Sequence, residues 1–290
     1  MAKIADLLAA GRTFSFEFFP PRNDDEQARL VRTLRELEPL EPAFVSVTYR
    51  GGRWSRDKTL DLVAGMLKTT SLNPMAHLTC VVHSRLELAE ILVDLRKAGV
   101  ENVLALGGDP PPAGEEGIAE LFYAVELVEL ARAIGGFSIG VAAHPESHPR
   151  SESRESDRRF LAEKLRMADF GITQFFFRLD DYLRMVDELS ALGVDKPVVP
   201  GIMPITNVSS ITRMAELSGA AVPPEVVARF DGVDDRDEMR RIGVDIATEL
   251  CQALLDRGAP GLHFYTLNFS RATREIYAQL GLGPRSSAVA

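Results

Sequence analysis

Eight short β-like runs recur along the chain, and each is followed by a stretch with helical periodicity. The runs are rich in Val, Ile, Phe and Thr and mostly lack alternation, which is typical of parallel strands buried on both faces. They begin at Phe14, Phe44, His77, Val103, Phe137, Ile172, Val198 and Leu262. Eight βα units in succession predict an α/β fold of one closed (β/α)₈ barrel rather than an open doubly wound sheet. No G-x-G-x-x-G segment follows the first run, which counts against a dinucleotide-binding domain of the doubly wound type.

Helix boundaries are marked in the stretches between the runs. The first helix is expected to start at Asn23 or Asp24 and to end at Pro39, and Ser84 with Glu87 forms a capping-box pattern for a helix that closes at Gly99. The interval after the seventh run is clearly longer than the others, so extra helix is expected between strands seven and eight. We expect residues 1–290 to form a single barrel domain, with a frayed tail over residues 283–290.

Length and composition restrict the function. A chain of 290 residues suits one barrel of about 250 residues with insertions. The net charge of −9 argues against general binding to nucleic acids or anionic membranes, which need a basic face. No apolar run reaches the ~20 residues of a membrane helix, and the N-terminus, which carries Asp6, is a poor secretion signal. Because Cys80 and Cys251 cannot form a disulfide framework, we expect a reducing, cytoplasmic setting.

Glu17 is the sharpest candidate for chemistry. Barrel active sites lie at the C-terminal ends of the strands, and Glu17 lies in the first run, FSFEFF, followed by the rigid pair Pro20 and Pro21. Since a carboxylate among phenylalanines is costly to desolvate, we expect its pKa to be raised. A carboxyl that stays protonated near neutrality can act as a general acid. The structural alternative is an ion pair with an arginine across the barrel.

Two further strand ends carry polar side chains. Asp109 follows Gly107 and Gly108, which let backbone approach a ligand closely. Its carboxylate could bond the amino-pyrimidine edge of a ligand or stabilise positive charge, or it could merely close a βα turn. Gln174 lies in ITQFFF among apolar neighbours, so we expect it to hydrogen-bond a ligand or the next strand.

Two other features are possible ligand sites. His144 and His148 stand four residues apart in HPESHP, but the prolines prevent the helix that an H-E-x-x-H metal site requires, so no metal is expected. A basic cluster could hold an anionic small ligand, or it could belong to a solvated loop. Its members are Arg50, Arg53, Arg56 and Lys58.

The chain resembles the bacterial methylenetetrahydrofolate reductases in seven segments taken in order, from about Phe14 to Leu282. The segments are FSFEFFPPR, FVSVTY, AHLTC, ALGGDPPP, ITQFFF, PGIMPITN and LHFYTLN. The resemblance implies a (β/α)₈ barrel that reduces 5,10-methylenetetrahydrofolate to 5-methyltetrahydrofolate. Family members usually carry FAD and take electrons from NADH or NADPH, of which NADH is favoured here. The implied partners are a folate and a nicotinamide, with a homo-oligomer as one possible state.

The resemblance also implies a role for each matching residue. Glu17 matches the general acid, Asp109 matches the residue that contacts the pterin and tunes the site, and Gln174 matches a residue that bonds the folate. Leu267 and Asn268, in the Y-T-L-N segment, are candidates for substrate binding. Other matching positions are candidates for contact with the flavin or a nicotinamide, namely Thr48, His77, Gly108, His148, Asp157 and Lys164, and His144 is a further candidate although it departs from the family residue.

Departures from the family pattern gather in the flavin pocket. Gly107 stands where the family usually has Arg, and His144 stands where it usually has Tyr. On the next helix, Phe160 and Glu163 align with the usual Asn and Arg, and a change from Arg to Glu reverses the charge beside a pyrophosphate. Departures near the substrate and nicotinamide positions are Ser210 for Gln, Met214 for Phe, and Phe269 for the Arg after Y-T-L-N, with Arg271 two positions later.

Two interpretations of the cofactor follow. Either FAD binds through replacement contacts, or NADH takes its place and passes hydride directly to the substrate. Because the proton donor is kept while the flavin contacts are lost, we favour direct transfer. A catalytically inactive folate- or nucleotide-binding barrel is the alternative from another class, and the retained Glu17 argues against it. A barrel reductase acting on another pterin is a third option, which Gln174 and the Y-T-L-N segment make weaker.

Overall fold

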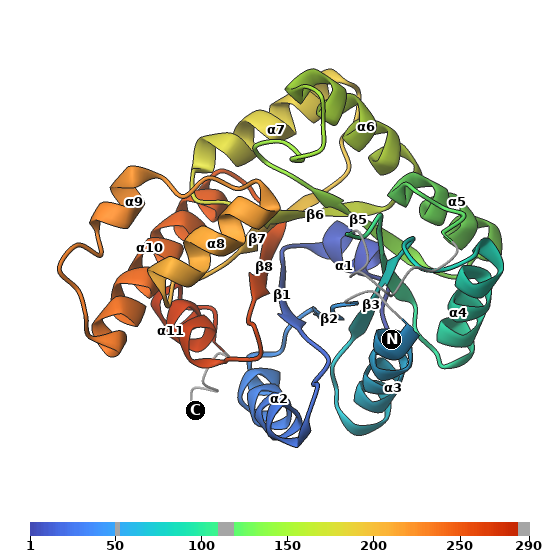
Figure 1. Cartoon of the computed structure of the whole chain (residues 1–290), viewed down its shortest axis with the longest axis horizontal. Helices are drawn as coiled ribbons and strands as arrows, with labels where there is room; N and C mark the ends of the chain where they lie inside the picture. The colour runs from blue at the N-terminus through green and yellow to red at the C-terminus, as the bar shows by residue number, and fades with distance from the viewer. Residues whose placement is uncertain (50–52, 110–118, 284–290) are drawn as a thin grey trace, which may run out of the picture.

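A computed structural model describes residues 1–49, 53–109 and 119–283, without the side chains of residues 53–58. Eight parallel strands close into a barrel in sequence order (Figure 1), which confirms the predicted fold class. The strands are β1 (Thr13–Phe18), β2 (Phe44–Val47), β3 (Pro74–Thr79), β4 (Asn102–Leu106), β5 (Ser138–Ala143), β6 (Phe170–Phe175), β7 (Val198–Ile202) and β8 (Gly261–Tyr265). The side chains of the predicted basic cluster, Arg50, Arg53, Arg56 and Lys58, are outside the described part of the structure. Residues 284–290 of the predicted frayed tail are also outside it.

Helices surround the barrel in the described part of the chain. They are α1 (Ile4–Ala10), α2 (Asp24–Leu37), the 3₁₀ helix η1 (Glu38–Leu40), α3 (Arg53–Thr69), α4 (Arg85–Lys97), α5 (Ala124–Ile134), α6 (Arg154–Met167), α7 (Leu179–Ala191), α8 (Val208–Ser218), α9 (Pro224–Ala228), α10 (Arg236–Asp256) and α11 (Arg271–Gln279). The helices α8, α9 and α10 lie between β7 and β8, which confirms the extra helix expected there.

The predicted helix starts are confirmed by their caps. Asn23 caps α2, because its side chain accepts a hydrogen bond from the Glu26 amide. Ser84 and Glu87 form both halves of the capping box of α4. The third strand begins at Pro74, before the predicted start at His77. A proline fits the first position of a strand, and this weakened the sequence signal there.

The N-terminal helix α1 closes one end of the barrel, which the sequence pattern did not predict. The Ile4 amide donates to Asn102 Oδ1 at 2.8 Å, and the Ala5 amide donates to Ser138 Oγ at 3.0 Å. Ile4 is fully buried and packs with side chains from inside the barrel, namely Phe44, Met75, Leu104, Phe170, Ile172 and Val199. This apolar layer seals the N-terminal end, so ligands must enter from the other end.

Strand β1 presents different chemistry on its two faces. Successive strand residues point to opposite sides. Phe16 and Phe18 therefore pack outward among the helices, and the Phe16 ring lies 5.3 Å from that of Tyr277 on α11. Ser15 and Glu17 point the other way, into the barrel, where both are buried. The middle of the barrel is consequently polar, above the apolar layer that α1 seals.

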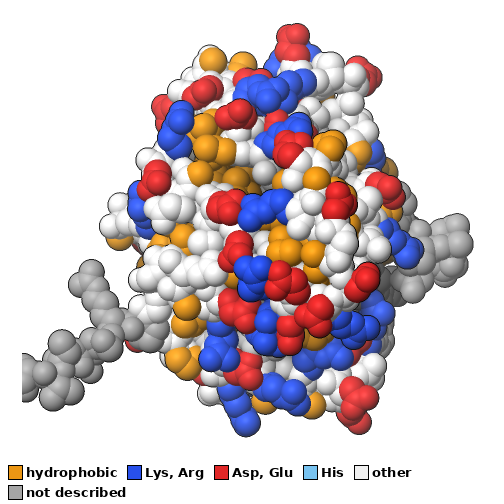
Figure 2. Space-filling view, turned by 90° about the vertical axis from the view of Figure 1, so that its left-hand side faces the viewer, with side chains coloured by type: hydrophobic (Ala, Val, Ile, Leu, Met, Phe, Trp, Pro, Cys, Tyr) orange, Lys and Arg blue, Asp and Glu red, His pale blue; other side chains and the backbone are white. Residues whose placement is uncertain are grey.

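Charge is distributed evenly over the face that Figure 2 shows, where Lys and Arg side chains are interspersed with Asp and Glu. Several opposite charges form ion pairs, such as Arg229–Glu249 at 2.6 Å and Arg241–Glu238 at 2.5 Å. A continuous basic surface, which nucleic acids require, is not seen on that face. Among the described residues, no helix has the length and apolar character needed to cross a bilayer.

Candidate active site

Glu17 lies near the C-terminal end of β1 with only 6% of its surface exposed. Four side chains, from β2, the residue after it, β3 and β8, surround its carboxylate, and we call these five residues the Glu17 cluster. Thr48 Oγ1 donates to Oε1 at 3.2 Å, and Ser46 Oγ donates to Oε2 at 3.4 Å. The Nε2 atoms of His263 and His77 lie 3.4 and 3.5 Å from Oε2. The barrel thus brings together Glu17, Thr48 and His77, which the sequence placed in separate roles.

The expected rise in the pKa of Glu17 is wrong. Burial does raise this pKa, but the hydrogen bond with His263, the electrostatic influence of the nearby His77 and His263 rings, and the hydrogen bond from Thr48 together lower it below its usual value. Phe14, Phe16 and Phe18, which alternate with Glu17 along the strand, point away from the carboxyl and pack outward. The structural alternative, an ion pair with an arginine, is also wrong for the described side chains. The ion-pair contacts of Glu17 are with His77 and His263.

His263 and Ser46 were not among the residues that the sequence singled out. A signal existed, because closing the barrel pairs β1 with β8 and sets Glu17 beside Tyr265 and Ser15 beside His263. An inward histidine on the eighth run next to an inward glutamate on the first follows from that register. Burial lowers the pKa of His77 to about 4, so this ring is neutral near pH 7.

The loop after β4 carries Gly108 and Asp109. Gly108 has φ +87°, and a Cβ there would lie 2.6 Å from Val81 Cγ2, so the position demands glycine. Asp109 is exposed, and within the described part of the chain its carboxylate shares no hydrogen bond with the Glu17 cluster. Arg150 reaches this loop, since its Nη2 donates to the Gly108 carbonyl at 3.4 Å. Because Asp109 is exposed, its carboxylate is accessible to a ligand.

The loop between β5 and α6 is held by a buried arginine that the sequence pattern did not reveal. Arg158 is 3% exposed, and its guanidinium donates to the His144 carbonyl at 3.0 Å and to Glu188 at 2.7 Å. It also pairs with Asp157 at 2.5 Å, and Asp157 in turn accepts from the His148 amide at 3.0 Å. These contacts engage the Asp157 carboxylate in holding the loop that carries both histidines.

Two histidines and a lysine are the cationic candidates near this loop: burial makes the histidines neutral near pH 7, and a backbone carbonyl already holds the lysine. The rings of His144 and His148 meet edge to face at 4.6 Å, and burial lowers the pKa of His144 to about 3. Lys164 Nζ donates to the Ala142 carbonyl at 2.9 Å, and burial lowers its pKa to about 8. On α6, Phe160 and Glu163 are both exposed. Neutral histidines and an engaged lysine form a weak site for a phosphate.

Gln174 and the Y-T-L-N segment are engaged by the backbone. Gln174 Oε1 accepts from the amide of the adjacent Phe175 at 3.0 Å, rather than bonding the next strand as one alternative predicted. The Asn268 side-chain amide bonds both the N–H and the C=O of Phe19 at 2.9 Å. Leu267 and Asn268 have positive φ values of 51° and 60°. This tight loop after β8 fixes the chain that follows Glu17.

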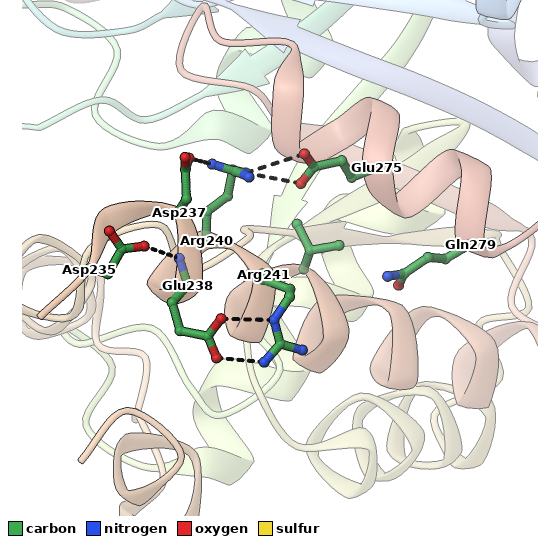
Figure 3. Close-up of a pocket in the computed structure, with 8 residues that line it drawn as sticks. Asp235, Asp237, Glu238, Arg240, Arg241, Glu275 and Gln279 are labelled. Carbon is green, nitrogen blue, oxygen red and sulfur yellow. Dashed lines mark hydrogen bonds and ion pairs between the residues drawn. The ribbon is translucent and has the colours of Figure 1, made fainter. Parts of the chain in front are cut away.

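A crevice between α10 and α11 contains none of the predicted site residues (Figure 3). Its charged side chains bind one another: Arg240 pairs with Glu275 at 3.1 Å and Arg241 with Glu238 at 2.5 Å. Such exposed pairs form a solvated network rather than a ligand site. Within the described ranges, no group of three or more His, Cys, Asp or Glu side chains could hold a metal ion.

The family model and the sequence relatives that match this chain agree on one family. A family model described as methylenetetrahydrofolate reductase matches residues 3–281. The 5,10-methylenetetrahydrofolate reductase of Pectobacterium carotovorum is 39% identical over 272 residues, which cover 93% of this chain and 90% of that protein. The Arabidopsis thaliana protein named methylenetetrahydrofolate reductase (NADH) 1 is 35% identical over 297 residues. That match covers 97% of this chain but only 50% of the plant protein.

Among solved structures, a Clostridium thermocellum protein described as binding two copies of 5-methyl-5,6,7,8-tetrahydrofolic acid has a TM-score of 0.62. The match covers 93% of this chain and 96% of that one, at 12% identity. At this identity the likeness supports the barrel fold alone.

Proposed function

The chain belongs to the methylenetetrahydrofolate reductase family, and from that membership we propose that it reduces 5,10-methylenetetrahydrofolate to 5-methyltetrahydrofolate with a reduced nicotinamide. It is an oxidoreductase of that family. The name of the Arabidopsis relative favours NADH as the electron donor. The observation that carries the proposal is the Glu17 carboxyl, buried near the end of β1 at the open end of the barrel, where the reaction needs a proton donor.

The reaction requires a proton before hydride can be accepted. The methylene carbon bridges N5 and N10 of the folate, and protonation of N10 opens the ring to a cationic iminium at N5. Glu17 supplies that proton, directly or through a water molecule, and hydride from the nicotinamide then adds to the exocyclic carbon. The Asp109 carboxylate favours the iminium cation by Coulombic attraction. One proton and one hydride are consumed, and the nicotinamide leaves oxidised.

Glu17 must hold a proton in the substrate complex, although its pKa is lowered in the free site. Burial is the largest influence on this pKa, and it acts upward. A folate bound over the Glu17 cluster excludes the remaining water, which strengthens that influence and favours the protonated carboxyl. We therefore expect proton uptake to accompany folate binding.

The described residues do not fit a tightly held FAD. Gly107 stands where the family has an arginine, and a Cβ at Gly107 would meet only backbone atoms of Phe122 and Ala124 within 4 Å among the described residues. Asp157 and Lys164 are engaged in internal contacts, and Glu163 adds an exposed negative charge on α6. The nearby cations Arg150 and Lys164 each already donate to a backbone carbonyl, so a flavin pyrophosphate would find few cations free to pair with it.

The same site is sufficient for a nicotinamide that binds and dissociates in each turnover, because such a ligand needs less affinity than a resident flavin. A co-substrate needs only a KM of about 1 μM to 1 mM, whereas a resident flavin must stay bound through purification. NADH therefore binds beside the folate in a ternary complex and transfers hydride directly to the iminium carbon. No step in this scheme passes through a flavin.

The purified protein is expected to be colourless and to oxidise NADH with methylenetetrahydrofolate when no flavin is added. The ultraviolet–visible spectrum and an initial-rate assay measure this directly. Direct transfer needs both substrates bound together, so double-reciprocal plots at several NADH concentrations should intersect. A yellow preparation with stoichiometric flavin, or parallel lines, would overturn direct transfer and leave a flavin-dependent enzyme of the same reaction. If the folate is reduced neither without flavin nor with flavin added, the result would favour a catalytically inactive binding barrel.

Replacing Asp109 by Asn is expected to weaken folate binding and slow hydride transfer together. The substitution keeps the shape but removes the charge that favours the cation and bonds the pterin. Folate titration and single-turnover kinetics measure the two effects separately. Asp256→Asn, at the end of α10, is a surface control. If neither parameter changes in Asp109→Asn, the residue only closes the turn after β4.

A further inference from the structure

We propose that His263 on β8 is a positioning residue that, together with Ser15 on β1, allows Glu17 to lose and regain its proton. The inference rests on the proposed function, in which Glu17 donates a proton to the substrate. Neither residue was among the candidates from the sequence.

His263 is held in one orientation inside the barrel. It is fully buried, and its ring stacks on Phe44 with centroids 5.9 Å apart and 14° between the planes. Its Nδ1 lies 2.8 Å from Ser15 Oγ, and its Nε2 lies 3.4 Å from Glu17 Oε2. The ring therefore bridges a hydroxyl on one side and the carboxyl on the other.

The Ser15 hydroxyl has two acceptors within reach, His263 Nδ1 at 2.8 Å and the Leu262 carbonyl at 3.4 Å. A neutral histidine has one donor nitrogen and one acceptor nitrogen. When Ser15 donates to Nδ1, the proton of the ring is on Nε2 and is donated to an ionised Glu17. When Ser15 donates to Leu262, it accepts from Nδ1–H, and Nε2 accepts from a protonated Glu17. Both protonation states of Glu17 thus find a partner without movement of the backbone.

The other titratable groups around Glu17 do not perform this role. His77 Nε2 on β3 lies 3.5 Å from Glu17 Oε2, but among the described residues it makes no hydrogen bond, whereas both ring nitrogens of His263 have partners. Tyr265 on β8 donates its hydroxyl proton to the Thr173 carbonyl at 2.6 Å, and burial together with Glu17 raises its pKa. Strand β2 and the residue after it contribute only the hydroxyls of Ser46 and Thr48. Among the described residues, the ion-pair contacts of Glu17 are with histidines alone.

The direction of the effect follows from these contacts. After Glu17 gives up its proton, the Nε2–H of His263 stabilises the anion, so the residue makes Glu17 a stronger acid. Without that donor, burial dominates and the pKa of Glu17 rises. Activity that needs protonated Glu17 is present below this pKa and falls as the pH rises through it. Loss of His263 should therefore slow proton transfer and move the alkaline fall to higher pH.

The test is the pH profile of kcat/KM for His263→Leu and His263→Gln. In His263→Leu, which removes both nitrogens, we expect kcat to fall about 10-fold or more and the alkaline limb to move to higher pH. His263→Gln restores an N–H near the position of Nε2, so its limb should return toward that of the wild type. Thr13→Val is the matched control, because Thr13 lies on β1 with Ser15, is 1% exposed, and has an Oγ1 without a partner among the described residues. It should change neither quantity.

A lower kcat with an unmoved limb in a folded His263→Leu would overturn the proposal, because a merely structural role predicts that result. Thermal melting establishes folding, and if His263→Leu does not fold, the wild type still decides. In ¹⁵N-histidine NMR spectra of the free enzyme, assigned through His263→Gln, His263 should have its proton on Nε2 while Glu17 is ionised. A proton on Nδ1 in that state would contradict the inference. Full turnover in Glu17→Gln would instead refute the general-acid role of Glu17, the part of the proposed function on which the inference rests.

Discussion

Replacing Glu17 by Gln should lower turnover by about 100-fold or more while leaving folate binding largely intact. The amide keeps the size of the side chain and can still accept from Thr48 and His263, so the ground-state complex changes little. It cannot supply the proton that opens the ring, so the loss falls on the transition state. Steady-state kcat and a folate binding titration measure the two quantities.

The matched control is Glu90→Gln, an identical change at an exposed position on α4. It should keep turnover and binding at the level of the wild type. If Glu17→Gln also does so, Glu17 is not the general acid, and the proton must come from elsewhere in the site. If Glu17→Gln loses folate binding as well as turnover, the carboxylate is needed to hold the substrate rather than to protonate it.

Replacing Gly243 by Ala should destabilise the fold by about 3 kcal/mol or more, the upper range for overpacked positions. Gly243 lies in α10, and a Cβ there would lie 1.7 Å from the carbonyl oxygen of Ile205. The obstacle is backbone in the loop after β7, which cannot rotate away as a side chain could. For a chain of this size, the loss corresponds to a drop in Tm of roughly 6–12 °C. Urea unfolding and thermal melting provide the two measurements.

Gly65→Ala on α3 is the control for that experiment. Nothing among the described residues lies within 4 Å of a Cβ at Gly65, so the same substitution meets no obstacle there. Alanine in a helix is favoured over glycine by roughly 0.5–1 kcal/mol, and the variant should be as stable as the wild type or slightly more stable. An unchanged Tm in Gly243→Ala would show that α10 can shift away from Ile205 at little cost.

The architecture was available from the sequence because its signals are local. Runs of β-branched and aromatic residues separated by helical periodicity predict alternating strands and helices, and Asn23 and Ser84 mark helix starts through hydrogen bonds to residues three positions later. The long interval before β8 similarly predicted additional helix. The helix α1 was not predicted, because Ile4 acquires its importance from the barrel interior that it seals rather than from a neighbour in sequence.

The sequence also identified Glu17 as the residue with the strongest claim to chemistry, but only the tertiary structure decided its surroundings. The adjacent phenylalanines suggested an apolar site, yet strand alternation turns Phe16 and Phe18 toward the helices. Closure of the barrel then brings His263, from the far end of the chain, within 3.4 Å of the carboxylate. These contacts lower the pKa of Glu17, whereas the apolar surroundings suggested by the sequence would have raised it. The charge state of a buried group depends on atoms within a few ångströms, and in a closed barrel these come from strands that are distant in sequence.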